Sequence, residues 1–380
     1  MTVQTDSQIL QKLESVQVMR AICMMCVLVA HALVAYVAGI GASHQIPQEL
    51  SFFMLTFVRM GVGIIDIFFI GSGFIMVYLT RATYGQPGAR LEFIIRRLTR
   101  IVPAFWFYMT CAILLSLWWP ETTLFQDVTA ERVVKSYGFI PYFWGDVHQA
   151  ATHPYPILIP GWTLNYEMVF YALFALTLFC KDMRTGIIAF AIATLTLIVA
   201  HQFVPQDNAI AYFWTHPQMM KFLGGMLIGY AFDRGVFFNI PMKGVVAIIT
   251  VTVLIQAALY SFLPPELSGV VWFNLLMTIL ACIVGICVVL TPFVQKKLPT
   301  WLIKIGDATY TIYLSQFIIM GLIVVGPNMY FDVPWWGTAI LTLIGAVATV
   351  FWGLFSYPRV EVPVSQVLRR LLLRSKQRPA

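Results

Sequence analysis

The feature that most constrains this chain is a series of long apolar runs that recurs from end to end. Each run has about 20 residues, the length at which an α-helix crosses roughly 30 Å of hydrocarbon. Only 11% of the residues are charged and 59% are hydrophobic, whereas about a quarter of the residues in an average soluble domain are charged. The sequence therefore predicts an all-α, polytopic integral membrane protein, a helical bundle embedded in the lipid bilayer.

Ten spans can be drawn along the chain, with no internal repeat and no separate soluble domain. The expected spans are residues 18–40, 55–80, 101–119, 161–180, 185–203, 215–232, 241–263, 269–293, 304–325 and 335–357. The chain thus divides into an N-terminal segment (1–16), a membrane domain (17–360) and a basic tail (361–380). The longest loop, about 120–160, is long enough to fold over one mouth of the bundle.

The basic residues set the expected orientation of the spans. The net charge is +7, but most Lys and Arg residues gather in short loops on one side and in the tail, as they do on the cytoplasmic side of membrane proteins. The loop 81–100 alone carries Arg81, Arg90, Arg96, Arg97 and Arg100. Since the number of spans is even, both termini are expected in the cytoplasm and the loop 120–160 outside. The charge is interpreted as a topology signal, and no nucleic acid partner is expected.

Two titratable residues occupy the first span. Arg20 and His31 are eleven residues apart, so in an α-helix they share one face and are separated by about 16 Å along the axis. With Arg20 at the cytoplasmic edge, His31 falls near the middle of the bilayer, where an ionisable group needs a polar cavity or a partner. One interpretation has Arg20 reaching to the interface and His31 bonded to a neighbouring helix. The other gives His31 a chemical role, because an imidazole titrates near neutral pH and can take a proton from a hydroxyl.

The second span, GVGIIDIFFIGSGFIM, holds a carboxylate and a glycine-rich segment. Asp66 needs a partner inside the membrane, and Arg59, seven residues earlier, lies on roughly the same helical face. Gly71, Ser72 and Gly73 allow another backbone or a ligand to approach closely. Close helix packing explains these glycines equally well.

An arginine cluster precedes the third span in the stretch RRLTRIVPAFW. Arg97 and Arg100 are three residues apart and share a helical face, and Arg96 adds charge. Paired guanidinium groups bind phosphate through forked hydrogen bonds. Topology explains the sign of the cluster but does not require its density, so phosphate binding is a second interpretation.

Polar residues reappear in the fourth and ninth spans. Glu167, in PGWTLNYEMVFYALF, could orient an imidazole, bind sugar hydroxyls, or pair with Arg59 or Lys221. In GDATYTIYLSQF, Tyr313 lies among other polar residues in or beside the ninth span.

Six cysteines lie within or at the ends of apolar runs. Cys23 and Cys26 are spaced like a metal-binding pair, but no second pair or nearby histidine completes a zinc site. No metal is therefore expected.

In this order and at these spacings, the motifs make the chain resemble the type-3 membrane acyltransferases, integral-membrane O-acyltransferases of bacteria and some eukaryotes. The resemblance covers about residues 14–357 and rests on RAICMMCVLVAH, DIFFIGSGF, RRLTRIVP, GWTLNYEMVFY and GDATYTIYLSQF. The sequences LESVQVMRA and PGWTLNYEMVFY are most similar to those of the exopolysaccharide O-acetyltransferase branch, which is found beside succinoglycan- or cellulose-type polymer systems.

The resemblance implies transfer of an acetyl group from cytoplasmic acetyl-CoA, the co-substrate, to a hydroxyl of a polysaccharide or oligosaccharide outside the bacterial inner membrane. It also implies a polysaccharide synthase complex as a partner. Together with the residue chemistry, it leads us to expect the following site residues: Arg20, His31, Ser72 and Glu167 in catalysis; Arg96, Arg97, Arg100, Gly73 and Phe74 in acyl-CoA binding; and Arg59, Asp66 and Tyr313 as supporting polar groups.

The chain departs from the family pattern in the ninth span. Many members have Tyr-Leu followed by any residue and then histidine, whereas here Tyr313 and Leu314 are followed by Ser315 and Gln316. A glutamine cannot act as an acid or a base, so this position is not expected to transfer protons.

Two other classes of protein fit the same composition. A proton-coupled secondary transporter would also place Arg, His, Asp and Glu inside the bundle, although no inverted repeat or pair of broken helices is evident. A non-enzymatic subunit of a polysaccharide synthase would lack coenzyme A binding and thioester hydrolysis. Direct transfer and an acyl-enzyme both remain open, as do acetyl, succinyl and other short acyl groups.

Overall fold

The structure is a computed structural model that describes residues 6–40, 48–119, 128–143, 155–205, 207–264, 267, 270–291 and 298–374. Within these ranges, it does not describe the side chains of residues 6–13, 48–53, 55–60, 62 and 374. The side chain of Arg59, much of the loop 120–160 and the end of the basic tail therefore lie outside the described part of the protein.

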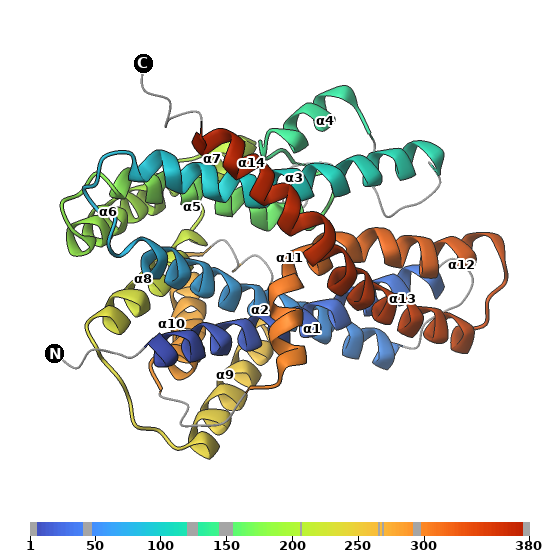
Figure 1. Ribbon diagram of the computed structural model, residues 1–380. Coiled ribbons are helices and arrows are strands. Elements are labelled where there is room, and N and C mark those ends of the chain that lie inside the picture. Colours follow the sequence, from blue (N-terminus) through green and yellow to red (C-terminus); the bar gives the residue numbers. More distant parts are fainter. Residues whose placement is uncertain are drawn as a thin grey trace. The chain divides into compact units, whose positions relative to one another are not determined.

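The described residues form helices and no strand (Figure 1). The helices are α1 (Asp6–Ile40), α2 (Gln48–Thr80), α3 (Ala89–Trp118), α4 (Ala130–Tyr137), α5 (Gly161–Thr177), α6 (Met183–His201), α7 (Ala209–Thr215), α8 (Met219–Asp233), α9 (Met242–Phe262), α10 (Val271–Val289), α11 (Thr300–Met320), α12 (Gly326–Tyr330), α13 (Trp335–Ser356) and α14 (Val362–Arg374), with π-helical turns η2 (Gly321–Val325) and η3 (Tyr357–Glu361).

Eight helical segments among the described residues are long and apolar enough to cross a membrane. The all-α, multi-pass membrane class predicted from the apolar runs is confirmed. Two of the ten expected spans, 161–180 and 215–232, correspond to α5 and α8, which have 17 and 15 residues. Both are shorter than the roughly 20 residues that a straight crossing needs.

Proline explains why the expected span 215–232 is shorter in the structure. His216, which precedes Pro217, has an extended backbone with ψ of 138°, because a residue before proline is pushed away from the helical region. The apolar run is thus divided into the short helix α7 and the later helix α8.

Two other expected boundaries are moved by the structure. Helix α3 begins at Ala89 rather than near residue 101, so the arginine cluster lies on the helix and not in a loop. The tail expected from 361 is helical through Arg374, because η3 joins α13 to α14 without a break. A π-helical turn accommodates a proline at this junction, Pro358.

The chain folds into two compact units. Unit 1 comprises residues 1–34, 46–81 and 220–310, and unit 2 comprises residues 35–45, 82–219 and 311–380. Helices α1 and α11 contribute residues to both units, as does α8 through its first residue, Met219.

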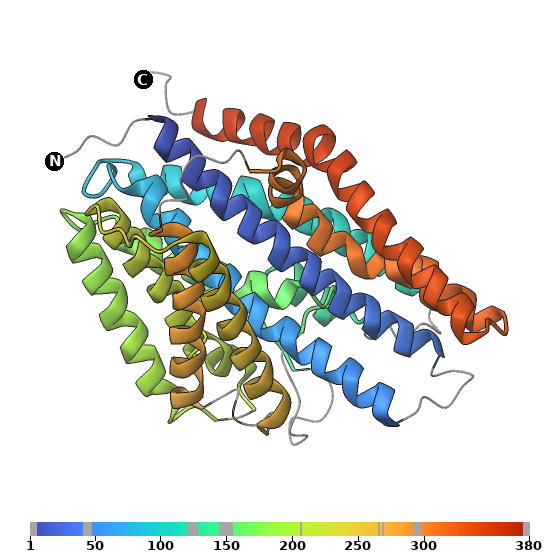
Figure 2. The same cartoon turned by 90° about the horizontal axis from the view of Figure 1, so that it is seen from below.

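Small residues determine the packing of unit 1. Helices α2, α9 and α10 pack against one another (Figure 2), and α8 crosses α2 at two glycines. A Cβ added at Gly73 would lie 2.1 Å from the carbonyl oxygen of Phe222, and one at Gly225 would lie 2.0 Å from that of Ile70. Because no side chain larger than hydrogen fits, these glycines permit direct contact between the two backbones.

Aromatic side chains form much of the core of unit 2. Helix α3 packs on α5 and α14, and α5 packs on α6. Phe105, Phe170, Phe174 and Phe190 are fully buried. The indole of Trp352 on α13 donates a hydrogen bond to the Tyr108 hydroxyl on α3, with a distance of 2.8 Å.

Candidate active site

Helix α1 carries the predicted pair Arg20 and His31. The helix is continuous from Asp6 to Ile40, so the expected axial separation of about 16 Å applies. The Arg20 guanidinium donates to Thr309 Oγ1 of α11 at 2.7 Å and to Gln17 Oε1 at 3.1 Å. Arg20 therefore binds a neighbouring helix rather than only reaching for the interface. The His31 ring is half-buried and its Nδ1 atom is shielded from solvent.

Close backbone contact brings Thr309 to Arg20. A Cβ on Gly306 would lie 2.1 Å from the carbonyl oxygen of Gln17, so a glycine is required where α11 meets α1. One turn later, Thr309 points its hydroxyl at the guanidinium and donates to the Gly306 carbonyl at 2.9 Å. The hydrogen bond and the close approach of the two backbones join α11 to α1 at this point.

Asp66 pairs with Lys221, a residue that the sequence analysis considered as a partner of Glu167. Lys221 Nζ lies 2.6 Å from Asp66 Oδ1, and both side chains are almost completely buried. Tyr260 donates to Asp66 Oδ2 at 3.0 Å, and Lys221 donates to Asn274 at 3.4 Å. The expectation that Asp66 needs a partner is correct, and that partner is Lys221. Lys221, one of the partners considered for Glu167, thus forms its described ion pair with Asp66.

The glycine-rich segment of α2 packs against protein. Gly73 touches the backbone of α8. The Phe74 side chain is buried and its ring contacts Tyr78 and Phe232, with centroids 5.8 Å and 5.7 Å away. Helix packing, one of the two interpretations given to this segment, accounts for both residues. Ser72 is half-buried on the same helix.

The three arginines of α3 have different surroundings. Arg96 is exposed and forms an ion pair with Glu92 one turn earlier. Arg97 and Arg100 are half-buried. The Nε atom of Arg97 is buried and makes no hydrogen bond to the described residues. Its charge interacts with Arg100 and Arg96, which repel it, and with Glu167, which attracts it.

A polar stripe runs along α5 beside these arginines. We define it as Thr163, Glu167 and Tyr171, which recur every four residues and therefore share one helical face. Tyr171 donates to Glu167 Oε2 at 3.2 Å. Thr163 donates to the Tyr313 hydroxyl of α11 at 3.2 Å, and Tyr313 also interacts with the charge of Glu167. In unit 2, the structure thus brings together Arg97, Arg100, Glu167 and Tyr313.

Gln316 lies one turn beyond Tyr313, where many type-3 acyltransferases have histidine. Its side chain is fully buried, and its amide donates to the Tyr313 carbonyl at 3.0 Å. The Oε1 atom makes no hydrogen bond within the described residues. Gln316 can accept a hydrogen bond from a ligand but cannot move a proton.

Several residues of these groups were not singled out from the sequence. Thr163 and Tyr171 could have been found, because both lie four residues from Glu167. Lys221 was considered from the sequence only as a possible partner of Glu167, although a cation inside an apolar run is itself a signal. Tyr260 and Asn274 gave no signal, since isolated neutral polar residues are common in membrane helices. His, Cys, Asp and Glu side chains in the described ranges form no cluster of three that could hold a metal ion.

The arrangement suits the handling of an anion and of a hydroxyl. Two half-buried guanidinium groups with one nearby carboxylate can hold phosphate oxygens. A half-buried imidazole can take a proton from an attacking hydroxyl. The apolar helices that carry these groups define a multi-pass membrane protein.

Comparison with known proteins identifies the family. Residues 13–357 match the model of the acyltransferase domain family, and the chain belongs to that family. It is a membrane acyltransferase, and the transporter and non-enzymatic alternatives are set aside.

Individual relatives agree with this conclusion. The exopolysaccharide production protein ExoZ of Rhizobium meliloti is 30% identical over 83% of this chain and 90% of its own length, in agreement with the exopolysaccharide branch. O-acetyltransferase OatA of Staphylococcus aureus is 25% identical over 44% of this chain and 29% of its own length. A putative membrane-bound transacylase, BcsY of Komagataeibacter xylinus, is 23% identical over 78% of this chain and 74% of its own length. No solved structure matches.

Proposed function

We propose that this acyltransferase moves an acetyl group from cytoplasmic acetyl-CoA to a hydroxyl of a polysaccharide outside the bacterial inner membrane. The match to an exopolysaccharide production protein supports the acceptor class, and the match to an O-acetyltransferase supports the acetyl group. The basic loops of the sequence support cytoplasmic access for the donor.

The proposed reaction needs a general base, a surface that binds the phosphates of coenzyme A, and a hydrogen-bond donor that stabilises the developing oxyanion. Arg97 and Arg100 hold the phosphates of coenzyme A. His31 removes the proton of the sugar hydroxyl as its oxygen bonds to the acyl carbon, and Ser72 donates to the oxyanion. The carbon–sulfur bond then breaks, and the proton passes from His31 to the departing thiolate. The products are the sugar ester and free coenzyme A.

The remaining predicted residues support these steps. Arg20, bound to Thr309, fixes the rotation of α1 and hence the direction of His31. Glu167 and Tyr313 accept and donate hydrogen bonds to sugar hydroxyls from the polar stripe.

One observation carries the proposal: Arg97 is a half-buried cation with two arginines and one carboxylate in its surroundings. Burying like charges together is unfavourable, and a buried N–H without a partner costs about 1–3 kcal/mol. The Arg97 Nε has no hydrogen bond to the described residues. A bound phosphate would neutralise the excess charge and accept from this N–H, which explains why the arginines are turned inward.

Binding of coenzyme A to purified protein tests the donor side. Replacing Arg97 and Arg100 by glutamine should weaken coenzyme A binding by roughly tenfold or more per lost charge-assisted bond, at about 1.5–3 kcal/mol each. Arg90→Gln is the matched control, because Arg90 is exposed on the same helix and stacks on Phe179. Unchanged affinity in the double variant would remove these arginines from donor binding.

Transfer to glycan in detergent, followed with radiolabelled acetyl-CoA, tests the chemistry. His31→Ala should retain coenzyme A binding and the parent melting temperature while losing transfer by roughly 10²–10⁴-fold, the usual contribution of a general base. Activity equal to that of the parent would exclude His31 from proton transfer.

Association with a polysaccharide synthase remains a prediction. Co-purification of this protein with synthase subunits from native membranes would test it.

A further inference from the structure

The last helical stretch of the chain is longer than one crossing of a membrane requires. Trp335–Leu373 is a single helical segment of 39 residues, which is about 58 Å long at roughly 1.5 Å per residue. The hydrocarbon core is only about 30 Å thick, and a tilt of up to about 40° does not take up the excess. The 22 residues of α13 already cover about 33 Å. The remainder, η3 and α14, therefore leaves the hydrocarbon core.

Side chains at the two ends of α13 indicate where the hydrocarbon begins and ends. Trp335 and Trp336 are exposed at the start of the helix, and indole rings favour the membrane interface. Arg359, three residues after the end of α13, is also exposed, and a guanidinium that faces lipid near the middle of the bilayer is costly. Arg359 thus belongs at the opposite interface. The distribution of basic residues predicts that this interface is the cytoplasmic one.

Helix α14 is held in place by its inner face. The helix packs on α3 (Figure 1), and Val362, Ser365 and Leu368, at spacings of three residues, are half-buried on one side of it. Just before the helix, the buried Glu361 carboxylate accepts a hydrogen bond from the Thr311 hydroxyl of α11. These contacts determine which side of α14 points outward.

The outward side of α14 is apolar. Val364, Val367 and Leu371 recur at spacings of three and four residues and therefore share a face, which we call the apolar face of α14. Their exposed fractions are 40%, 54% and 64%. Gln366 and Arg370, four residues apart, are exposed on a separate polar edge. A helix with an exposed apolar face beside a basic edge is typical of the membrane interface.

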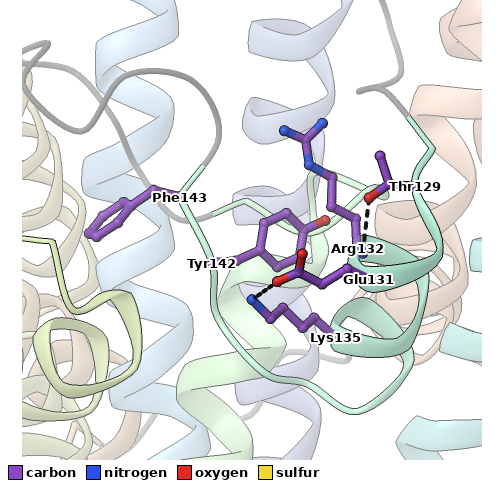
Figure 3. A pocket seen from close by; sticks show the side chains of 6 residues that line it. All are labelled: Thr129, Glu131, Arg132, Lys135, Tyr142 and Phe143. Atoms are coloured by element: carbon purple, nitrogen blue, oxygen red, sulfur yellow. Dashed lines mark hydrogen bonds and ion pairs between the residues drawn. The ribbon is translucent and has the colours of Figure 1, made fainter.

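The charge around the apolar face is positive and has no acidic partner in its own segment. Residues 362–380 contain five Lys or Arg residues and no Asp or Glu, and Arg369 and Arg370 are exposed. Helix α4 shows the contrast, because beside the pocket in Figure 3 the Lys135 ammonium forms an ion pair with Glu131 one turn earlier. In α14 the anions that balance the arginines have to come from outside the segment.

We propose that α14 lies in the cytoplasmic interface of the bilayer and binds anionic phospholipids. The apolar face enters the boundary between headgroups and acyl chains, and Arg369 and Arg370 donate charge-assisted hydrogen bonds to the lipid phosphates. A cluster of about four to eight Lys or Arg residues directly after a membrane span is typical of binding to an anionic lipid surface. The proposed reaction uses none of these residues, so the inference is independent of the proposed function.

A fluorescent probe on the full chain in lipid nanodiscs tests the position of α14. The six native cysteines are replaced by alanine. Leu371→Cys then carries the dye NBD on the apolar face, and Gln366→Cys carries it on the polar edge of the same helix. A nitroxide on the lipid acyl chain should quench the dye at position 371 at least about twofold more than the dye at position 366. Equal quenching at the two positions would overturn the proposal.

Nanodiscs of phosphatidylcholine, with and without about one third phosphatidylglycerol, test the charge. The anionic lipid should increase the quenching at position 371. Arg369→Gln combined with Arg370→Gln should abolish that increase, because each basic residue contributes about fivefold to the affinity for an anionic surface.

Arg184→Gln combined with Arg234→Gln is the matched control for charge. Both arginines are exposed, lie in other segments and are expected on the same side of the membrane. This variant should retain the full increase in quenching. No increase in the parent, an increase that persists without Arg369 and Arg370, or an equal loss in the control would each show that α14 does not recognise anionic lipid.

Discussion

At the scale of single residues, the Asp66–Lys221 ion pair in unit 1 has a high cost of desolvation. Both side chains are almost fully buried, and moving two charges out of water costs several kcal/mol per ion. The direct contact at 2.6 Å and the hydrogen bonds from Tyr260 and to Asn274 offset that cost. Since each of the four groups comes from a different helix, the pair links α2, α8, α9 and α10.

Removing one partner of this pair should be worse than removing both. Asp66→Leu or Lys221→Met leaves an uncompensated charge in the core and should destabilise the protein by about 3–5 kcal/mol. The double variant replaces the pair by apolar groups and should recover much of that loss. Melting temperatures in detergent for the four proteins check this. Additive losses in the double variant would show that the two charges act independently.

A second prediction at this scale concerns Glu167. Glu167→Gln removes the negative charge that attracts Arg97, so coenzyme A affinity should stay equal or rise. Transfer should fall by roughly tenfold, because the carboxylate that accepts a charge-assisted hydrogen bond from a sugar hydroxyl is replaced by a neutral amide. Glu92→Gln is the control, since Glu92 is an exposed carboxylate on α3 that pairs with Arg96. A loss of coenzyme A affinity in Glu167→Gln would contradict the electrostatic argument.

At the scale of helices, the crossing of α2 and α8 depends on glycines, which have no side chain to separate the two backbones. Gly73→Ala puts a methyl group 2.1 Å from the Phe222 carbonyl oxygen, and the helices must separate, which should cost about 1–3 kcal/mol. Gly71→Ala, two residues earlier, meets only the flexible end of Met19 at 3.3 Å and should be nearly neutral. Equal melting temperatures for the two variants would show that the crossing is not tightly packed.

The start of α6 gives a pH-dependent prediction. Asp182 caps the helix by accepting from the Thr185 hydroxyl and amide, and these bonds lower the pKa of its carboxyl group below the ordinary value. The stabilisation is therefore complete above the pKa of the unfolded chain and is lost as the pH falls through the lower, folded value. Asp182→Ala should lower the melting temperature at neutral pH and leave it unchanged at a pH below both values. A difference that persists in acid would assign the effect to something other than this carboxylate.

At the scale of the whole molecule, each unit holds one part of the predicted chemistry. Unit 1 contains Arg20, His31 and Ser72, and unit 2 contains Arg97, Arg100 and Glu167. The family match covers both units, so the acyltransferase domain is not confined to one of them.

The expected topology makes a prediction at the same scale. A cysteine introduced by Ala130→Cys, on the exposed start of α4, should react with a membrane-impermeant maleimide added to intact cells. One introduced by Ser375→Cys, near the C-terminus, should react only after the membrane is opened. The reverse labelling pattern would contradict cytoplasmic termini.

The sequence alone determined the class of the protein. The length of an apolar run decides whether it can cross the bilayer, and the positions of Lys and Arg decide its orientation, and both are properties of the chain itself. It also placed Arg97 and Arg100 on one face and identified Asp66 as a charge that needs a partner. Only the tertiary structure decided that the partner is Lys221, that Gly73 serves the α8 crossing, and that Glu167 and Tyr313 lie with the arginines. These contacts join residues about 70–155 positions apart in the sequence, and helical periodicity governs only neighbours within a few turns. The partners of these residues therefore depend on how the helices pack, which no local sequence pattern specifies.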